Sequence, residues 1–213
     1  MTALGAALAL SLAACDNQTG FSGSVGNTPN GPKLASYQIL GTVGTSFVAT
    51  VSDSRSSWSL KGNAPLNIII CNNILPARVI ATKTSGDNSL LSVEFVLGTK
   101  AVNIQSTAAP FGTVEGQVGG TLTTIAPPAD PDLRIFVSGP EARRYSALVE
   151  DIDTGFVIAS RAPTLILFDN PNGKVDATLF GGQDFGTFTA NMELGGEIVL
   201  SLSGGPNLTI RQP

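Results

Sequence analysis

Hydrophobic and polar residues alternate in short runs along most of the chain that follows residue 33. Residues 36–41, 47–52 and 92–97 each place apolar side chains at every second position, and Gly, Asn, Asp and Pro separate such runs from one another. A period of two puts alternate side chains on opposite faces of a strand, whereas a helix would show a period of about 3.6 residues. The pattern therefore predicts an all-β protein built from short strands.

A turn is predicted at Asn170-Pro171-Asn172-Gly173, between the apolar runs 165–169 and 174–180. Proline presets φ for the first position of a turn, and glycine adopts the positive φ that the last position often needs. This stretch predicts a hairpin that joins its two flanking strands.

The chain also repeats itself at an offset of 98 residues. Between residues 37–72 and 135–170, eight of 36 aligned positions are identical, where composition alone would give roughly two or three. After a deletion of two residues, the stretch from Arg78 to Thr82 aligns with the stretch from Lys174 to Thr178. The identical pairs are Gly41/Gly139, Ala49/Ala147, Val51/Val149, Asp53/Asp151, Ala64/Ala162, Pro65/Pro163, Ile68/Ile166 and Asn72/Asn170.

This repeat predicts two tandem immunoglobulin-like β-sandwich domains related by internal duplication, with Trp58 as a core aromatic residue of the first. Each copy has the length and the strand number of such a sandwich. The alternative is one larger β-sandwich or barrel built from both copies. The expected organisation is a signal peptide (1–14), a lipidated cysteine with a flexible tether (15–33), domain 1 (34–125), a Pro-rich linker (126–131) and domain 2 (132–213).

The composition argues against nucleic-acid binding and against chemistry that depends on histidine. Charged residues make up only 13% of the chain, the net charge is −4, and no basic run exists, so nucleic-acid binding has no electrostatic basis. Histidine is absent, which removes the commonest general base and the commonest transition-metal ligand.

The N-terminal segment 2–14 is apolar but shorter than the roughly 20 residues that a membrane-spanning helix needs. Its length fits the hydrophobic region of a secretory signal peptide. Leu12-Ala13-Ala14-Cys15 resembles the lipobox of bacterial lipoproteins. The resemblance implies lipid attachment at Cys15, export, and anchoring to a bacterial membrane that faces the periplasm or the cell surface. The alternative is a plain secretory signal cleaved after Ala14.

The segment that follows Cys15 supports an anchor. Residues 16–33 are rich in Gly, Asn, Ser, Thr and Pro and contain a single aromatic residue, Phe21. Such a composition cannot form a core and predicts a flexible tether.

Few side chains suggest chemistry. Glu150, Asp151 and Asp153 place three carboxylates within four residues, which is a candidate calcium site because calcium prefers clustered oxygen ligands. No spacing selects a catalytic pair among Glu94, Glu115, Glu193 and Glu197. Cys71 follows three isoleucines, so we expect it to be buried and unreactive.

These observations predict an exported, lipid-anchored protein of the cell envelope that acts as a non-catalytic binding, spacer or assembly module. The expected partners are the membrane, through the N-terminal lipid, and an unidentified protein or glycan. A carbohydrate- or calcium-dependent ligand-binding module is the second hypothesis, and a hydrolase that uses carboxylates alone is the third. No cofactor other than calcium is expected.

Overall fold

A computed structural model describes residues 21–25, 33–97, 100–139, 143–152, 155–169, 171, 173–180, 186–205 and 207–213. These residues form strands and no helix, so the all-β prediction is confirmed. The strands are β1 (Phe21–Val25), β2 (Lys33–Gly41), β3 (Ser46–Ser52), β4 (Ser57–Asn63), β5 (Leu66–Asn73), β6 (Ala77–Lys83), β7 (Leu91–Leu97), β8 (Lys100–Thr107), β9 (Thr113–Val118), β10 (Leu133–Ser138), β11 (Arg144–Glu150), β12 (Gly155–Arg161), β13 (Thr164–Phe168), β14 (Asp176–Phe180), β15 (Phe188–Leu194), β16 (Glu197–Gly204) and β17 (Asn207–Arg211).

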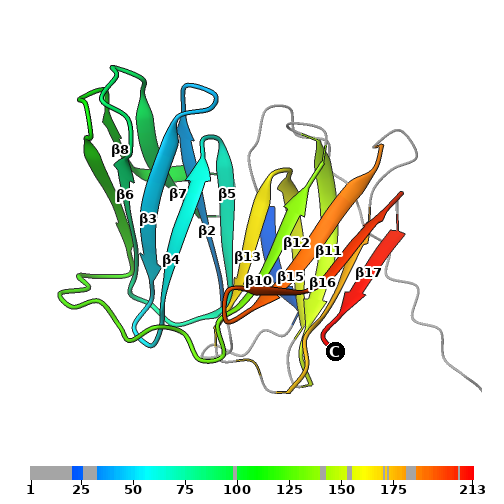
Figure 1. The fold of residues 1–213 in the computed structure, drawn as a ribbon. Helices are drawn as coiled ribbons and strands as arrows, with labels where there is room; N and C mark the ends of the chain where they lie inside the picture. Colours follow the sequence, from blue (N-terminus) through cyan, green and yellow to red (C-terminus); the bar gives the residue numbers. More distant parts are fainter. Residues whose placement is uncertain are drawn as a thin grey trace, which may run out of the picture.

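The strands form three sheets (Figure 1). The long sheet has the order β16-β15-β10-β13-β5-β2-β7-β8 and runs through the whole molecule. A four-stranded sheet, β4-β3-β6-β9, packs on one end of it, and a five-stranded sheet, β1-β12-β11-β14-β17, packs on the other. Each end is thus a β-sandwich, as the sequence predicted.

The two halves of the molecule have the same strand order. Strands β2 to β9 form the sheets β5-β2-β7-β8 and β4-β3-β6-β9, and strands β10 to β17 form β13-β10-β15-β16 and β12-β11-β14-β17. The ladders also agree with the offset of 98 residues, since Val51 lies opposite Val79 in the first half and Val149 lies opposite Ala177 in the second. This register needs no deletion before Arg78, so the two-residue gap in the sequence alignment was wrong.

The strand order differs from that of immunoglobulin domains, in which the third strand lies beside the sixth. Here the third strand of each half, β4 or β12, pairs with the second, β3 or β11. The sandwich architecture is therefore confirmed without the immunoglobulin arrangement, and descent of the two halves from one duplicated unit stays a prediction.

The halves meet at a seam formed by β5 and β13. These equivalent strands pair in parallel, with Leu165 opposite Ile68 and Ile166 opposite Ile69. Because neighbouring side chains of a strand point to opposite faces, each seam strand contributes to both sandwiches. Ile68 and Ile70 join the first core together with Leu165 and Leu167, whereas the side chains that alternate with them join the second core. The residues that face the second core are Ile69, Cys71, Ile166 and Phe168.

This arrangement places the two covering sheets on opposite faces of the long sheet. The four-stranded sheet covers the face that bears Ile68, and the five-stranded sheet covers the face that bears Ile69. The seam strands are therefore covered on both sides, which explains why residues 68–71 and 165–168 are apolar without alternation.

The structure differs from the sequence-based predictions at three places. Residues 21–25, assigned to the tether, form β1 and pair antiparallel with β12, because their backbone completes the free edge of that strand. The Pro-rich linker is docked on β4, where the Ser57 backbone bonds Pro127 and Ala129 at 2.8 and 2.9 Å. The turn near Gly173 joins β13 to β14, which belong to different sheets, so it is not a hairpin.

Candidate functional site

The structure describes only part of the residues predicted to carry chemistry. Cys15 and Asp153 lie outside the described residues. Glu150 is the exposed last residue of β11, opposite Asp176, whose Oδ2 atom lies 3.3 Å from Arg211 Nε. Within the described ranges, no three His, Cys, Asp or Glu side chains come together in a group that could hold a metal ion.

Cys71 is buried with a free thiol, so the predicted burial is confirmed. Its side chain faces the second core, beside Phe168 on the neighbouring strand. Burial raises the pKa of the Cys71 thiol, and the negative charge of Asp151 raises it further. Both effects disfavour the thiolate, which is the reactive form. Trp58, the other predicted core residue, is also buried.

A groove crosses the outer face of the four-stranded sheet. Its cavity volume is about 490 Å³. The register places Ser59, Thr50 and Ile80 in one row across β4, β3 and β6, and Lys61, Val48 and Thr82 in the next. The groove is lined by Val48, Ala49, Thr50, Ser59, Leu60, Lys61, Ile80, Thr82 and Arg134.

Arg134 is the one residue of the second half in this lining. It extends from β10 to the edge of β4, where its Nη1 atom donates to the Ser59 carbonyl at 3.0 Å. Asp132 accepts from Arg134 Nε at 2.8 Å and from Nη2 at 2.6 Å. These bonds raise the pKa of Arg134 further and hold the guanidinium in one orientation. Arg134 is thus the contribution of the second half to a groove that is otherwise lined by the first half.

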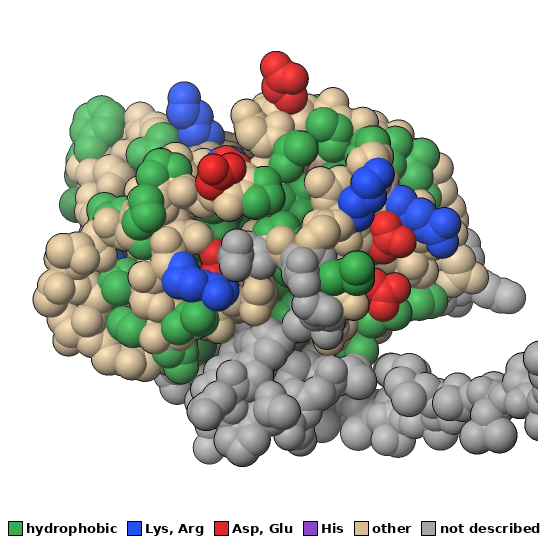
Figure 2. Space-filling model, turned by 90° about the horizontal axis from the view of Figure 1, so that it is seen from below, with side chains coloured by type: hydrophobic (Ala, Val, Ile, Leu, Met, Phe, Trp, Pro, Cys, Tyr) green, Lys and Arg blue, Asp and Glu red, His purple; other side chains and the backbone are tan. Residues whose placement is uncertain are grey.

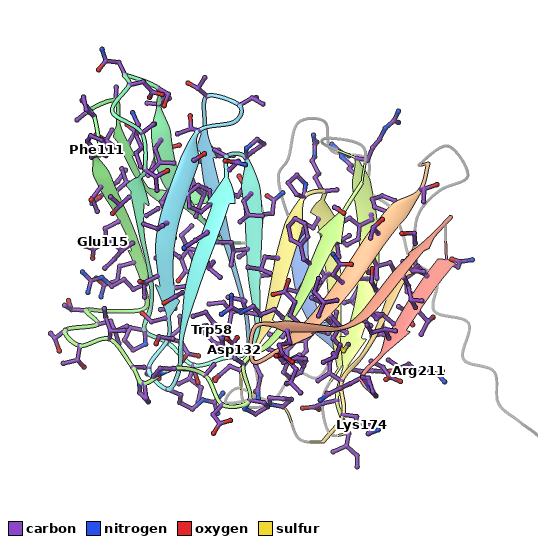
Figure 3. The ribbon with its side chains drawn as sticks, in the orientation of Figure 1. Trp58, Phe111, Glu115, Asp132, Lys174 and Arg211 are labelled. Atoms are coloured by element: carbon purple, nitrogen blue, oxygen red, sulfur yellow. The ribbon has the colours of Figure 1, made fainter. Side chains whose placement is uncertain are left out.

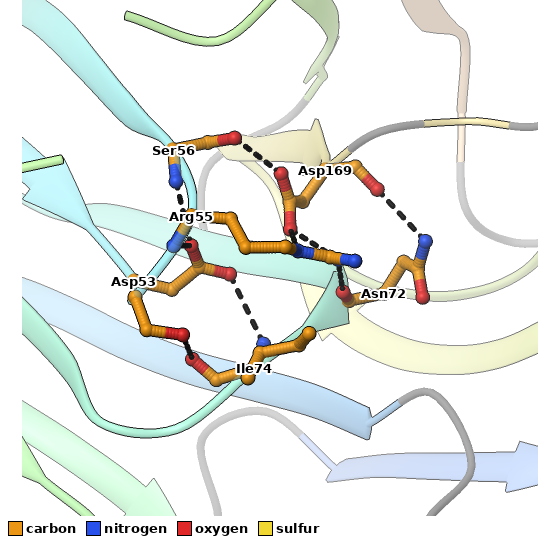
Figure 4. A network of polar contacts seen from close by, with 7 residues as sticks. Asp53, Arg55, Ser56, Asn72, Ile74 and Asp169 are labelled. Carbon is orange, nitrogen blue, oxygen red and sulfur yellow. Dashed lines mark hydrogen bonds and ion pairs between the residues drawn. The ribbon is translucent and has the colours of Figure 1, made fainter. Parts of the chain in front are cut away.

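Besides Arg134, a polar cluster joins the halves at the lower end of the seam (Figure 4). Arg55, in the loop between β3 and β4, forms an ion pair with Asp169, which directly follows β13. Arg55 also donates to the Asn72 carbonyl at 2.7 Å, and Ser56 Oγ donates to the Asp169 carboxylate. Asp53 holds this loop in place by accepting from the backbone of Ser56 at 2.9 Å and of Arg55 at 2.8 Å.

The Asp169 carboxylate is fully buried, and burial raises its pKa. The hydrogen bond from Ser56 lowers this pKa, the charge of Asp53 raises it, and Arg55 lowers it. Because Arg55 and Ser56 use both carboxylate oxygens, the cluster stabilises the contact between the halves. It leaves no oxygen of Asp169 unpaired for a substrate or an ion.

The sequence alone did not reveal the groove or the polar cluster around Asp169. Val48 and Ile80 were detectable in principle, because they are apolar residues at outward positions of alternating strands. The contributions of Arg134 and Asp169 were not detectable, because they depend on how the halves pair. Among the described residues, no carboxylate lines the groove, so it offers no acid pair for the hydrolase hypothesis. Glu115, one of the glutamates considered for such a pair, forms an ion pair with Arg78 at 2.9 Å.

Comparison with protein-family models, with curated proteins and with solved structures finds no match for this chain. The described part of the chain contains no helix of the length and hydrophobicity that crossing a bilayer requires.

Proposed function

We propose that this protein is an exported, lipid-anchored, non-catalytic binding module of the bacterial cell envelope. Lipid attachment at Cys15 rests on the lipobox-like stretch Leu12-Ala13-Ala14-Cys15 and on the apolar segment before it. The observation that carries the binding role is the groove of about 490 Å³ to which both halves contribute.

The groove suits a segment of a partner protein. Val48 and Ile80 supply apolar surface, and Thr50, Ser59 and Thr82 supply hydroxyl groups. Lys61 supplies a positive charge, and no carboxylate of the described residues pairs with it. None of the nine described lining residues is aromatic, so a stacking platform for a sugar ring is missing from this groove.

The edge of β4 beside the groove adds backbone groups to the site. β4 is the last strand of its sheet, and the linker and Arg134 use its edge only at Ser57 and Ser59. The following residues, 61–63, can pair with an extended segment, as edge strands do in β-augmentation. The partner segment we expect is extended and carries apolar and acidic side chains.

A site-specific photo-crosslinker tests the proposal in living cells. Placed at Val48, it should give one major adduct whose partner is identified by mass spectrometry. Placed at Ile104, an exposed apolar position on β8, it should give none. Lys61→Glu should reduce the Val48 adduct because it reverses the charge. Equal adducts at both positions, or no effect of Lys61→Glu, would contradict a binding site in the groove.

The anchor is tested separately. Mass spectrometry of the membrane fraction should show an acylated N-terminal Cys15, and Cys15→Ala should abolish the modification. A wild-type protein recovered in soluble form with a free Cys15 thiol would refute the anchor and leave the groove proposal intact.

A further inference from the structure

One end of the molecule, the upper end in Figure 1, gathers the turns 42–45, 84–90 and 108–112 of the first half. The ladders place these turns together, because Gly41 pairs with Leu91, Leu91 with Thr107, and Thr82 with Thr113. The turn 162–163 of the second half lies at the same end, since β13 runs parallel to β5.

The upper end of the first half exposes three large apolar side chains. Val43 is 72% exposed, Leu90 46% and Phe111 63%. Two hydrogen bonds join the turns of Val43 and Leu90, from Thr42 N to the Leu90 carbonyl at 3.0 Å and from Leu90 N to Thr42 Oγ1 at 3.1 Å. Figure 3 shows Phe111 at the opposite end of the molecule from Asp132, Lys174 and Arg211. We call Val43, Leu90 and Phe111 the apolar tip.

Phe111 is held in a conformation that large residues rarely adopt. Its φ is 52°, in the left-handed region, and its backbone N–H donates to the Ser85 carbonyl at 3.0 Å. The chain thus accepts an unfavourable backbone conformation while the aromatic ring faces solvent, a combination that suggests a function for the exposed ring.

The turn beneath Phe111 is fixed by a buried ammonium group. Lys83 Nζ donates to the Asp87 carbonyl at 2.6 Å and to the Ser89 carbonyl at 2.7 Å, and lies 3.2 Å from Asp87 Oδ1. Lys83 and Asp87 balance each other, so the residues 84–90 and 108–112 carry no unpaired charge. The tip is therefore a fixed, neutral, apolar projection.

The second half places three arginines at the same end. Arg144, the first residue of β11, lies directly opposite Arg161, the last residue of β12, and Arg143 precedes them. Like charges that face each other across a ladder are unfavourable. No carboxylate of the described residues forms an ion pair with any of the three. The lower end differs, because Figure 2 shows acidic and basic side chains together there.

The N-terminal chain leads to this end as well. Phe21, the first residue of β1, pairs with Ala159, two positions before the end of β12. Five residues separate Cys15 from Phe21. Even fully extended, that stretch spans roughly 20 Å. A lipid on Cys15 would therefore keep the upper end close to the membrane surface.

We propose that the upper end docks on the membrane that holds the anchor. The apolar tip enters the interfacial region of the bilayer, and Arg143, Arg144 and Arg161 contact the phosphates of anionic lipids. The orientation rests on the proposed lipid at Cys15. The contact itself rests on the apolar tip and on the three arginines.

Tryptophan substitutions report the contact. The mature lipidated protein carrying Phe111→Trp is reconstituted in vesicles of phosphatidylglycerol and brominated phosphatidylcholine, and Ile152→Trp is the control. Ile152 is 75% exposed in the turn after β11, at the lower end, and the native Trp58 is buried and constant. We expect fluorescence quenching in the Phe111→Trp protein to exceed that in the Ile152→Trp protein roughly twofold or more, because interfacial side chains sit about 5–10 Å deep. Leu90→Trp should repeat the result if Phe111→Trp perturbs its turn.

The arginines are tested in the same system. Adding Arg143→Gln and Arg144→Gln to the Phe111→Trp protein should reduce its quenching in vesicles that contain phosphatidylglycerol, whereas adding Lys174→Gln at the lower end should not. Equal quenching of the Phe111→Trp and Ile152→Trp proteins, with the Cys15 lipid confirmed in both, would overturn the docking and leave the anchor intact. Selective quenching of the Phe111→Trp protein when it lacks the lipid would support the docking and show that the contact does not depend on the anchor.

Discussion

The seam strands β5 and β13 bury their side chains in a different way from β3 and β11 further out in each half. Along β11 and residues 46–51 of β3, buried and more exposed side chains alternate, because one face meets a core and the other meets solvent. In β13 every residue is buried, and residues 68–71 of β5 are likewise buried without a break. A strand covered on both faces requires apolar residues at every position, so an unbroken apolar run indicates the centre of a layered structure.

The largest effect is expected when the pairing of β5 with β13 is removed altogether. Residues 128–213 alone would keep β10 to β17 and expose the edge of β13 together with Leu165 and Leu167. We expect the fragment to associate or to unfold at lower urea concentration than the whole chain, because an unpaired edge and an uncovered apolar face are both unfavourable. Size-exclusion chromatography and circular dichroism measure this.

The two tandem domains predicted from the repeat imply that such a fragment folds by itself. A monomeric fragment with the urea midpoint of the whole chain would support that prediction, and it would show that the seam contributes little to stability.

A charge placed in the seam should have the next largest effect. Ile69 belongs to the first half but faces the second core. Ile69→Asp would bury an unpaired carboxylate, and we expect the free energy of unfolding to fall by more than about 4 kcal/mol. Val48→Asp, on the outer face of β3, should change it by less than about 1 kcal/mol. Urea denaturation followed by circular dichroism measures both, and similar losses would mean that the seam is not more constrained than the outer strands.

Removal of Arg55 should have an intermediate effect. Arg55→Ala leaves the buried Asp169 carboxylate without its ion-pair partner, and breaking a buried pair costs about 3–5 kcal/mol. We expect the lower limit, about 3 kcal/mol, because 35% of the Arg55 side chain is exposed and Ser56 still donates.

Two controls sharpen this test. Arg78→Ala breaks the more exposed pair with Glu115 and should cost about 0–1 kcal/mol. Adding Asp169→Asn to Arg55→Ala should recover part of the loss, because the uncompensated charge is gone. Equal effects of Arg55→Ala and Arg78→Ala would mean that the seam cluster has no special role.

The smallest expected effect is a loss of stability at alkaline pH, which Tyr37 in the first half and Tyr145 in the second half report. Burial raises the pKa of both Tyr37 and Tyr145, and the charge of Asp53 raises that of Tyr37 further. The native state therefore holds both phenol protons above the ordinary pKa of about 10, so the contribution of these groups to stability falls as pH rises beyond that value.

Tyrosinate absorbance measures this prediction. We expect no absorbance until the protein unfolds, and then ionisation of both tyrosines in one step, because the halves share the seam. Tyr37→Phe should halve the amplitude and leave the midpoint in place. Two separate steps in the wild type would show that the halves unfold independently.

The sequence by itself determined the strands and their faces. The alternation at residues 47–52 and the core position of Trp58 follow from a local rule, since an apolar side chain at every second position has one buried face. The offset of 98 residues was also readable, and the ladders reproduce it at Val51 and Val149. Turn chemistry near Gly173 identified a turn, because glycine favours the positive φ found there.

The tertiary structure alone decided which strands pair. A turn fixes where the chain reverses and not which sheet the next strand joins, so the expected hairpin became a crossing between sheets. The backbone of residues 21–25 can pair with any free edge, and β12 offers one. The ion pair of Arg55 with Asp169 and the reach of Arg134 to Ser59 join residues far apart in the chain. Such contacts exist only because two equivalent strands lie side by side, and no local pattern in either strand encodes its neighbour.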